Sequence, residues 1–479
     1  ELLQLELDDS LNCDVFGLAN DSRKVQPGVL FLAYPGALAD GRLYCQQAID
    51  KGALAVAYEP EDLPESFCFL STTVYIPVPG LAQKLAEIAS RFYHHPTKAL
   101  SVIGVTGTNG KTTIAYQLAQ AFHLLGMKSA YIGTIGQGEV TSLAPLSNTT
   151  PDALQLQFLF FEYQLAHVKQ VCMEVSSHAL DQGRVGCIEF KQAIYTNLSH
   201  DHLDYHHTMQ AYAQAKALLF TVPSLEWAIV NHDDAYAPLM LANLPEKCKK
   251  LTYGLQEGAD VRALKWKMDM TGTTFDVASP WGIHTVQVRT LGIFNLYNSL
   301  AVYSSLLAEN ISVPDVVDVM SKLVASPGRL EIVRQAPCVI VDYAHTPDAL
   351  ENVLSTLTEL KQAKLWVVFG CGGDRDRAKR PMMGKIAGQL ADCVVLTSDN
   401  PRSEDPMLIL DDIAAGLKLS AAHVVCIADR KEAIHHALQF AGKQDIILIA
   451  GKGHEDYQII GNQRLSFSDQ AVVRDYTSV

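Results

Sequence analysis

Short apolar runs separated by segments of helical periodicity recur along most of the chain. In residues 1–97, strand-like runs at 29–34, 53–58 and 74–78 precede a set of apolar residues at helical spacing, namely Leu81, Leu85, Ile88, Ala89 and Phe92. Residues 98–329 continue as strands alternating with helices, the first strand being at 101–105. The alternation restarts at residue 330, with apolar runs at 338–341, 365–369, 393–397, 424–427 and 446–450.

This alternation predicts an α/β protein, because continuous apolar strands between helices are typical of parallel sheets covered on both faces. At about 150 residues per domain, 479 residues suggest roughly three domains. We place them at 1–97, a small N-terminal α/β domain, at 98–329, a central parallel-sheet domain, and at 330–479, a C-terminal Rossmann-like domain.

Composition narrows the class of protein. With 48% hydrophobic and 19% charged residues, the chain is not dominated by disorder. The formal net charge of -14 repels phosphate backbones, so nucleic acid is not an expected partner. No apolar run approaches the roughly 18 residues of a membrane span, and the first residues lack the pattern of a signal peptide. The ten cysteines occur singly, which favours reduced core residues of a cytoplasmic protein over a disulfide or zinc framework.

The strongest chemical signal is a glycine-bracketed loop between a strand and a helix, SVIGVTGTNGKTT at 101–113. Glycines allow the backbone N–H groups of such a loop to face phosphate oxygens, and the helix N-terminus adds its positive dipole end. Lys111 is placed to reach the β- and γ-phosphates and Thr112 to bind Mg²⁺. The loop therefore predicts a P-loop type of ATP site at Gly107, Thr108, Asn109, Gly110, Lys111, Thr112 and Thr113.

Three further signals follow in the central region. Glu174 ends an apolar strand, where it is either a Mg²⁺ ligand or an ordinary strand-end carboxylate. The tract TNLSHDHLDYHH at 196–207 fits a zinc site, a solvated turn, or a magnesium site with one histidine. Lys216 lies in a helical stretch among apolar neighbours, where a lysine normally extends its charge to the surface.

In the C-terminal region, four polar clusters each follow an apolar strand. They are DYAHTPD at 342–348, GCGGDRDR at 370–377, SDNPRSEDP at 398–406 and GKGHE at 451–455. Because the carboxyl ends of parallel strands share one edge of the sheet, we expect the four clusters to converge on one crevice.

These motifs together resemble the Mur ligases, which use ATP to join amino acids to a carboxylate, and among them the MurE type. The resemblance rests on GTNGKTT, MEVSSH, YAQAKALLF, DYAHTPDAL, GCGGDRD, DNPR and GKGHE and extends over essentially the whole chain. It implies ATP and Mg²⁺, with Lys111, Glu174, His202 and Lys216 as catalytic residues. It also implies metal binding by Thr112, Glu174, His202 and Lys216, with Lys216 carbamoylated to N6-carboxylysine. Further ATP contacts would be Asn295, Asn298, Arg329 and Asp342.

The same resemblance implies the substrates. The acceptor would be UDP-N-acetylmuramoyl-L-alanyl-D-glutamate, bound by the N-terminal domain and the first half of the central domain. Its implied contacts are Asn20, Ser22, Ala37, Leu38, Ala39, Asn148, Thr149, Thr150, Ser176, Gln182 and Arg184. The incoming amino acid would be meso-2,6-diaminopimelate, bound by the C-terminal domain. Its implied contacts are Arg375, Asp399, Asn400, Pro401, Arg402, Gly451 and Glu455. The implied reaction is a step of peptidoglycan synthesis in the cytoplasm, and we expect a monomer.

Alternatives remain open at this point. The chain could be a lysine-adding homologue, a relative acting on folate or another peptide, a P-loop phosphotransferase or nucleotide switch, or a pure binding module. Arg402 itself has a second interpretation, as a loop residue paired with Glu404 or Asp405. We interpret Arg402 as a fork-shaped cation for the distal carboxylate of diaminopimelate, which lysine lacks.

Overall fold

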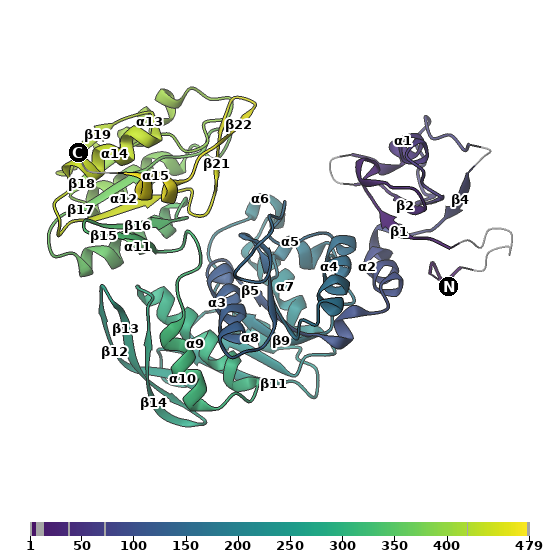
Figure 1. Cartoon of the computed structure of the whole chain (residues 1–479), viewed down its shortest axis with the longest axis horizontal. Helices are drawn as coiled ribbons and strands as arrows, with labels where there is room; N and C mark the ends of the chain where they lie inside the picture. The colour runs from purple at the N-terminus through teal and green to yellow at the C-terminus, as the bar shows by residue number, and fades with distance from the viewer. Residues whose placement is uncertain (1, 6–13, 37–38, 71–72, 419, 477–479) are drawn as a thin grey trace. The chain divides into compact units, whose positions relative to one another are not determined.

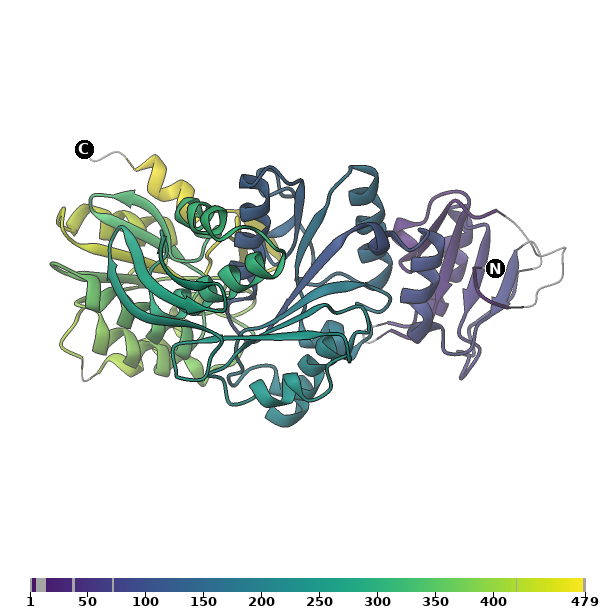
Figure 2. The same ribbon diagram turned by 90° about the horizontal axis from the view of Figure 1, so that it is seen from below.

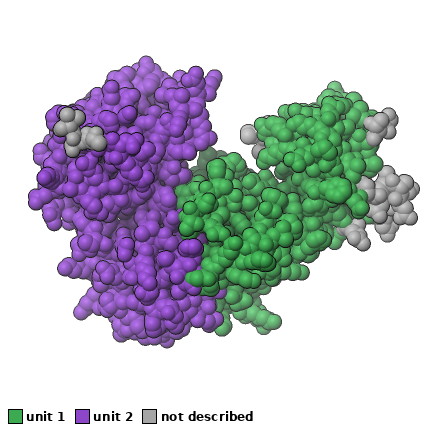
Figure 3. Space-filling view, in the orientation of Figure 1, with its two compact units in different colours: residues 1–111, 126–230, 234–250 green, residues 112–125, 231–233, 251–479 purple. Residues whose placement is uncertain are grey.

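The computed structural model describes residues 2–5, 14–36, 39–70, 73–418 and 420–476 (Figures 1 and 2). They form two compact units (Figure 3). Unit 1 holds residues 1–111, 126–230 and 234–250, and unit 2 holds residues 112–125, 231–233 and 251–479. Among the described residues, no helix has both the length and the apolar character needed to cross a membrane.

The N-terminal part of unit 1 is a four-stranded parallel sheet whose strands neighbour one another in chain order: β1 (Gly17–Ala19), β2 (Val29–Ala33), β3 (Ala55–Tyr58) and β4 (Val74–Pro77). Successive side chains of a strand face opposite sides. Leu30 and Leu32 therefore pack with α2 (Leu81–Phe92), whereas Phe31 and Ala33 pack with α1 (Cys45–Asp50). The strands and the helix expected in this region are confirmed, with ends that differ by one or two residues.

The central part of unit 1 is a parallel sheet in the order β10-β9-β5-β8-β6, with β7 antiparallel to β6 at its edge. The bounds are β5 (Ser101–Thr106), β6 (Ser129–Gly133), β7 (Gly136–Gly138), β8 (Gln170–Glu174), β9 (Phe190–Tyr195) and β10 (Trp227–Asn231). Helices α4 (Ala153–Leu165) and α7 (Met209–Ala217) contribute Leu156, Phe160 and Ala213 to the core on one face. The short helices α5 (Ser177–Asp181) and α6 (Leu203–His206) lie between these strands in the chain.

Helix α3 (Lys111–Leu124) follows the glycine loop, and its residues Ile114, Leu118 and Phe122 are fully buried. Unit 2 also contains three antiparallel strands that the sequence pattern did not predict: β12 (Val261–Asp269), β13 (Gly272–Ser279) and β14 (Gly282–Val288). The expectation that strands and helices alternate throughout 98–329 is therefore wrong here. Much of β12 and β14 is exposed, so these strands lack the continuous apolar run of a buried parallel strand.

The C-terminal sheet has the order β15-β16-β20-β17-β18-β19, in which only β15 (Glu331–Gln335) is antiparallel. Its parallel strands are β16 (Cys338–Asp342), β17 (Leu365–Phe369), β18 (Cys393–Leu396), β19 (His423–Cys426) and β20 (Ile446–Ala450), which confirms the five predicted apolar runs. Ile340, Val367 and Leu448 pack toward α11 (Pro347–Leu360), α12 (Lys379–Leu390) and α13 (Pro406–Ala414). Their neighbours Val341 and Val368 pack toward α14 (Arg430–Phe440) and α15 (Asp469–Asp475) on the other face.

Two smaller features differ from the expectations. A hairpin of β21 (Tyr457–Ile460) and β22 (Gln463–Ser466) follows the GKGHE cluster and was not predicted. The described cysteines are all free thiols, as expected, but Cys68, Cys187 and Cys426 are exposed rather than in the core. Single spacing indicates the absence of a disulfide framework, but it carries no information about burial.

Candidate active site

The phosphate loop connects β5 to α3. Gly107 (φ 148°) and Gly110 (φ 90°) adopt backbone conformations that favour glycine, and a Cβ on Gly107 would collide with the hydroxyl of Thr196. The segment after β9 is hydrogen-bonded to the loop. The N–H of Thr108 donates to the carbonyl of Asn197 (2.8 Å), and the hydroxyl of Thr196 donates to the carbonyl of Asn109 (2.6 Å). The loop is thus braced by a neighbouring strand end, and its glycines are required by geometry.

Two lysines converge on one carbonyl of this loop. Lys111, the first residue of α3, donates from Nζ to the carbonyl oxygens of Gly107 (2.9 Å) and Thr108 (2.8 Å). Lys216 in α7 donates from Nζ to the same Gly107 oxygen at 2.8 Å. Thr112 and Thr113, in the first turn of α3, are buried. The structure therefore brings Lys216 to the phosphate loop 109 residues before it, where the sequence motifs singled out Lys216 and the loop separately.

Lys216 does not extend to the surface, since only 1% of the residue is exposed. Its Nζ lies 4.4 Å from the centroid of the Tyr212 ring. Burial, followed by the positive charge of Lys111, lowers the pKa of Lys216 well below its ordinary value. A lowered pKa favours the neutral amine, which is the nucleophilic form of lysine.

Glu174 ends β8 and is also buried, with 1% of the residue exposed. Its Oε1 accepts hydrogen bonds from the hydroxyl of Tyr131 and the N–H of Thr134 (2.8 Å), and its Oε2 accepts one from the hydroxyl of Thr134 (3.2 Å). These donors hold the carboxylate in one orientation at the strand end.

His202 lies at the start of α6 with its backbone in the left-handed region (φ 54°). Its ring contacts those of His178 and Tyr212 edge-on, with centroids 5.0 Å and 5.9 Å apart, and its Nε2 is 3.5 Å from Asp201 Oδ2. Burial lowers the pKa of His202, opposed by the charge of Asp201. A lowered pKa favours the neutral ring, which is the form that can bind a metal.

The donor set fits magnesium better than zinc. Among the residues that the structure describes, no three His, Cys, Asp or Glu side chains are grouped to hold a metal ion, whereas structural zinc requires four such ligands. The hydroxyl of Thr112 and the carboxylate of Glu174 are hard oxygen donors, and Mg²⁺ usually takes only one or two protein ligands beside phosphates and water.

A second polar network runs from Glu174 to the predicted acceptor residues. The hydroxyl of Thr150 donates to the carbonyl of Glu174 (2.9 Å) and accepts from the N–H of Ser176 (3.0 Å). Arg184 donates from Nη1 to the carbonyl of Thr150 (3.1 Å) and from Nε to Gln182 Oε1 (2.9 Å). Four of the residues predicted to bind the acceptor are therefore joined to one another and to the strand end that carries Glu174.

The other predicted acceptor residues are more scattered. Thr149 shares a hydroxyl contact with Thr134 (3.0 Å), and Asn148 is exposed. Asn20 donates to the hydroxyl of Tyr34 (3.2 Å), and Ser22 donates to Gln47 (2.6 Å). The carbonyl of Ala39 accepts from the N–H of Gly36 (2.9 Å), while Ala37 and Leu38 lie outside the described residues.

The predicted nucleotide contacts of unit 2 are mostly buried. In α9 (Ile293–Ala308), Asn298 donates to Asn295 Oδ1 (2.9 Å), and Asn295 donates to the carbonyl of Leu291 (2.8 Å). Asp342, at the end of β16, accepts from the N–H groups of Leu330 and Ala344 (2.7 Å each). Burial raises the pKa of Asp342, opposed by the charge of Arg329. The guanidinium of Arg329 lies 4.6 Å from the centroid of the Tyr343 ring.

The loops at the carboxyl ends of the C-terminal strands contact one another. The N–H of Gly451 donates to the carbonyl of Asp342 (3.1 Å), and the N–H of Gly373 donates to the carbonyl of Asn400 (2.9 Å). Lys452 Nζ reaches Asn400 Oδ1 at 3.2 Å. The clusters after β16, β17, β18 and β20 therefore form one site at one edge of this sheet, as the topology argument predicted, and Pro401 is buried within it.

Arg402 pairs with neither Glu404 nor Asp405. Glu404 is bound by Arg380 (2.8 Å), and Asp405 caps α13 by accepting from the N–H of Met407 (2.8 Å). Arg402 instead donates from Nη1 to the carbonyl of Gly373 (2.8 Å), and no ion pair within 4.0 Å involves it among the described residues. The alternative interpretation of Arg402 as a paired loop residue is therefore wrong. Arg375, two residues after Gly373, is exposed.

The sequence reasoning missed several residues at these sites. Tyr212 lies one helical turn before Lys216, so the i, i+4 spacing is the signal that could have indicated it. Lys452 belongs to the GKGHE cluster, but nothing local predicts its burial. Tyr131 and Thr134, which bind Glu174, carry no sequence signal of this role.

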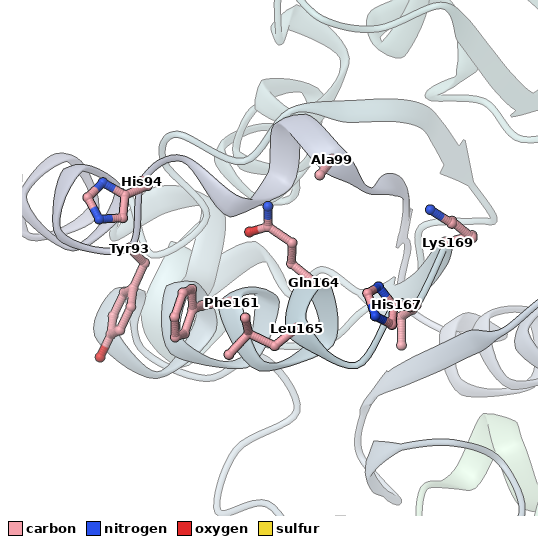
Figure 4. A pocket seen from close by; sticks show the side chains of 9 residues that line it. Tyr93, His94, Ala99, Phe161, Gln164, Leu165, His167 and Lys169 are labelled. Atoms are coloured by element: carbon pink, nitrogen blue, oxygen red, sulfur yellow. The ribbon is translucent and has the colours of Figure 1, made fainter.

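A surface pocket of 460 Å³ lies apart from the predicted site residues, between the end of α2 and the end of α4 (Figure 4). Its lining includes Tyr93, His94, Phe161 and His167. None of the residues predicted to bind ATP, the acceptor or the amino acid lines this pocket, so it does not contribute to the site described above.

Comparisons with known proteins cover nearly the whole chain. Family models match at residues 14–93 (Mur ligase family, catalytic domain), 105–306 (Mur ligase middle domain) and 328–453 (Mur ligase, glutamate ligase domain). The UDP-N-acetylmuramoyl-L-alanyl-D-glutamate--2,6-diaminopimelate ligase of Chromobacterium violaceum is 46% identical over 464 residues, covering 95% of this chain and 92% of that protein. The protein of the same name from Coxiella burnetii is 45% identical over 470 residues, covering 96% of this chain and 95% of its own.

Solved structures agree with these relatives. A structure of UDP-N-acetylmuramoyl-L-alanyl-D-glutamate--2,6-diaminopimelate ligase is 40% identical, covers 96% of this chain and 94% of its own, and superposes with a TM-score of 0.71. The MurF ligase from Thermotoga maritima in complex with ADP, at 17% identity, covers 94% of this chain and 96% of its own and shares the fold with a TM-score of 0.64. The three-domain α/β architecture and the resemblance indicated by the motifs are thereby confirmed. This chain belongs to the Mur ligase family.

Proposed function

We propose that this chain is an ATP-dependent amide ligase that adds meso-2,6-diaminopimelate to the D-glutamyl γ-carboxylate of UDP-N-acetylmuramoyl-L-alanyl-D-glutamate, in peptidoglycan synthesis. The observation that carries the proposal is identity of 45–46% over nearly the full length with two proteins of that name. We assign residues 1–97 to the UDP-sugar, 98–329 to ATP and 330–479 to the amino acid. The three separate family matches support this division.

The proposed chemistry has two steps, because a carboxylate is a poor electrophile. In the first step an oxygen of the D-glutamyl γ-carboxylate attacks the γ-phosphorus of ATP, an O–P bond forms, and ADP leaves. In the second step the amine of the amino acid attacks the acyl phosphate carbon. A C–N bond forms, phosphate leaves with the C–O electron pair, and the amine gives up a proton. The product is an amide together with ADP and phosphate.

In this proposal the loop from Gly107 to Thr113 binds the phosphates of ATP. Lys111 would exchange its loop carbonyl acceptors for phosphate oxygens, where a cation offsets charge that develops during transfer. From the family resemblance we also propose Asn295, Asn298, Arg329 and Asp342 as nucleotide contacts.

We propose that the amine of Lys216 adds to carbon dioxide and loses a proton, which makes a carbamate. The low pKa caused by burial and by Lys111 supports this step, because only the neutral amine carries the lone pair that attacks. The change converts a buried cation into an oxygen ligand. Thr112, Glu174, His202 and the carbamate would hold Mg²⁺, which when bound neutralises phosphate charge.

The acceptor would lie along the network from Glu174 to Arg184. Thr150, Ser176, Gln182 and Arg184 are already bonded to one another, so they would present a preorganised polar surface to the UDP-sugar peptide. Asn20, Ser22, Ala37, Leu38, Ala39, Asn148 and Thr149 would supply the remaining contacts. We include in the proposal that the enzyme acts in the cytoplasm as a monomer.

The amino acid would bind in the C-terminal site, with Arg402 on its distal carboxylate. Arg402 has no carboxylate partner within ion-pair distance among the described side chains. Its Nη1 donates to the carbonyl of Gly373, so Nε and Nη2 would be the pair that meets a bidentate ligand. Asp399 and Glu455 are suited to the distal ammonium, and Arg375, Asn400, Pro401 and Gly451 would line the rest of the pocket.

The test is phosphate release with ATP and the UDP-muramoyl dipeptide, comparing meso-diaminopimelate with L-lysine, with the product identified by its mass. We expect release that requires both substrates and strong rejection of lysine, because lysine leaves the guanidinium unpaired. Arg402→Ala should lower kcat/KM for diaminopimelate by a factor that corresponds to about 2–5 kcal/mol of lost transition-state stabilisation. This is the scale of a lost buried charge pair. Arg402→Lys is the matched control, since it keeps the charge but removes the fork. Equal kcat/KM for the two amino acids in the wild type would overturn the assignment.

A further inference from the structure

Lys452 is a positive charge with none of its surface exposed. It lies in the loop after β20, between Gly451 and Gly453, and nothing in the proposed function gives it a role. Burying an ammonium is costly unless it is paired and hydrogen-bonded. The identity of its partners therefore indicates what this lysine does.

Lys452 connects the two sides of the amino-acid site. Its Nζ donates to Glu455 Oε2 at 3.0 Å and to Asn400 Oδ1 at 3.2 Å, and it lies 4.0 Å from Asp399 Oδ1. Asn400 closes the triangle by donating from Nδ2 to the same Glu455 oxygen at 3.1 Å. The two carboxylates suited to a substrate ammonium therefore already share one protein cation.

The hairpin that follows keeps this arrangement in place. The N–H of Ile459 donates to Asn400 Oδ1 (2.9 Å), and Gln458 donates to the carbonyl of Asp399 (2.8 Å). The N–H of Arg402 donates to the carbonyl of Ile459 (3.1 Å). Asn400 is therefore oriented by both Lys452 and β21, and it turns its amide nitrogen toward Glu455.

The charges in this cluster cancel. Asp399 and Glu455 are negative, whereas Lys452 and Arg402 are positive. Arg375, the other cation that we place at this site, is exposed, so water screens its charge and the count is taken over these four groups. Two neighbouring ion pairs are each neutral: Arg430 with Asp469, and Arg464 with Asp456.

We propose that Lys452 is a specificity-determining residue for the amino acid, acting through its positioning of Glu455 and Asn400 and through this charge balance. The inference rests on the proposed function. The distal end of a 2,6-diamino dicarboxylic acid carries one ammonium and one carboxylate, so its net charge is zero and it matches a neutral pocket. The distal end of lysine carries only an ammonium, and it would match a pocket with one more negative charge. Lys452 therefore holds the pocket at the charge that favours the zwitterionic end.

The experiment changes the pocket charge in both directions and follows the ratio of kcat/KM for meso-diaminopimelate to that for L-lysine. Lysine is also measured as a competitive inhibitor, so weak binding is detected. Lys452→Met removes the charge at nearly constant length, and we expect the ratio to fall by about tenfold or more, in favour of lysine, because one unpaired carboxylate then faces the pocket. The KM for ATP should stay unchanged. Lys452→Arg restores the charge and should restore most of the ratio.

Glu455→Gln makes the reciprocal change and keeps the inference testable if Lys452→Met does not fold. The pocket then has one excess positive charge, so the ratio should rise as lysine binds less well. The double variant Lys452→Met/Glu455→Gln is neutral again, and its ratio should return toward that of the wild type. The inference would be overturned if Lys452→Met lowered kcat/KM for both amino acids by the same factor, or if Glu455→Gln left the ratio of the two unchanged. A wild type that shows no amino-acid-dependent phosphate release would instead overturn the proposed function.

Discussion

Arg430 and Asp469 form a completely buried ion pair behind the C-terminal site. Arg430 donates from Nε to Asp469 Oδ1 and from Nη2 to Oδ2, both at 2.8 Å, and neither side chain has exposed surface. The same guanidinium donates to the carbonyls of Ala450 (3.0 Å) and Ser398 (3.4 Å). These carbonyls belong to the residues immediately before Asp399 and Gly451. The ion pair therefore fixes the starts of two loops of the site by hydrogen bonds.

We expect Arg430→Met to lower the free energy of unfolding by about 3–5 kcal/mol, because it leaves a buried carboxylate without its cation. The double variant Arg430→Met/Asp469→Leu should lose less, since it removes the uncompensated charge as well. Arg464→Met is the matched control: Arg464 is 68% exposed, its partner Asp456 is 85% exposed, and the two lie 3.7 Å apart. A surface pair of this kind contributes about 0–1 kcal/mol.

The assay is urea denaturation followed by circular dichroism, with amide hydrogen exchange of β18 and β20 to locate the change in this sheet. Arg430→Met should also raise the KM for diaminopimelate, because the loops at Asp399 and Gly451 lose the hydrogen bonds that they share with Arg430. Stability of Arg430→Met within 1 kcal/mol of the control, or a double variant less stable than the single one, would refute the reasoning about uncompensated charge.

Three further predictions follow from the same structure. Lys111→Ala should abolish ligation while leaving the fold intact, because it removes one charge and two hydrogen bonds to loop carbonyls but no core volume; near-normal turnover would contradict the phosphate-loop assignment. Lys216→Ala should be inactive and should partly recover with short-chain carboxylic acids, which replace the missing oxygen ligand; activity without added acid would argue against a carbamate. Hydrogen bonding from Arg380 lowers the pKa of Glu404 to about 2. The ionised Glu404 therefore stabilises the folded state above pH 4.5, and this contribution to the free energy of unfolding is lost as the pH falls from 4.5 through 2. Glu404→Gln should therefore flatten the dependence of the urea midpoint on pH in that window, and an unchanged slope would show that the pair does not contribute.

Elements with strong local patterns were predictable. The strand ends at residues 105, 174 and 369 were placed to within one residue, because runs of apolar side chains report burial on both faces of a parallel sheet. The strands at 261–288 were not predicted, because half-exposed antiparallel strands carry polar residues and lack a continuous apolar run. The resemblance carried by the motifs led to the same family that the comparisons show.

What the sequence determined by itself was the chemistry available at each strand end: a glycine loop with a lysine, a strand-end carboxylate, and polar clusters after parallel strands. These features are local, because turn geometry and periodicity depend on residues near one another in the chain. Only the tertiary structure decided which of them meet. Lys216 reaches a carbonyl 109 residues away, and Lys452 reaches a side chain 52 residues away. Whether a lysine lies at the surface or is buried with its charge paired depends on such distant neighbours, and for that reason the pattern around Lys216 indicated an exposed side chain while the fold buries it.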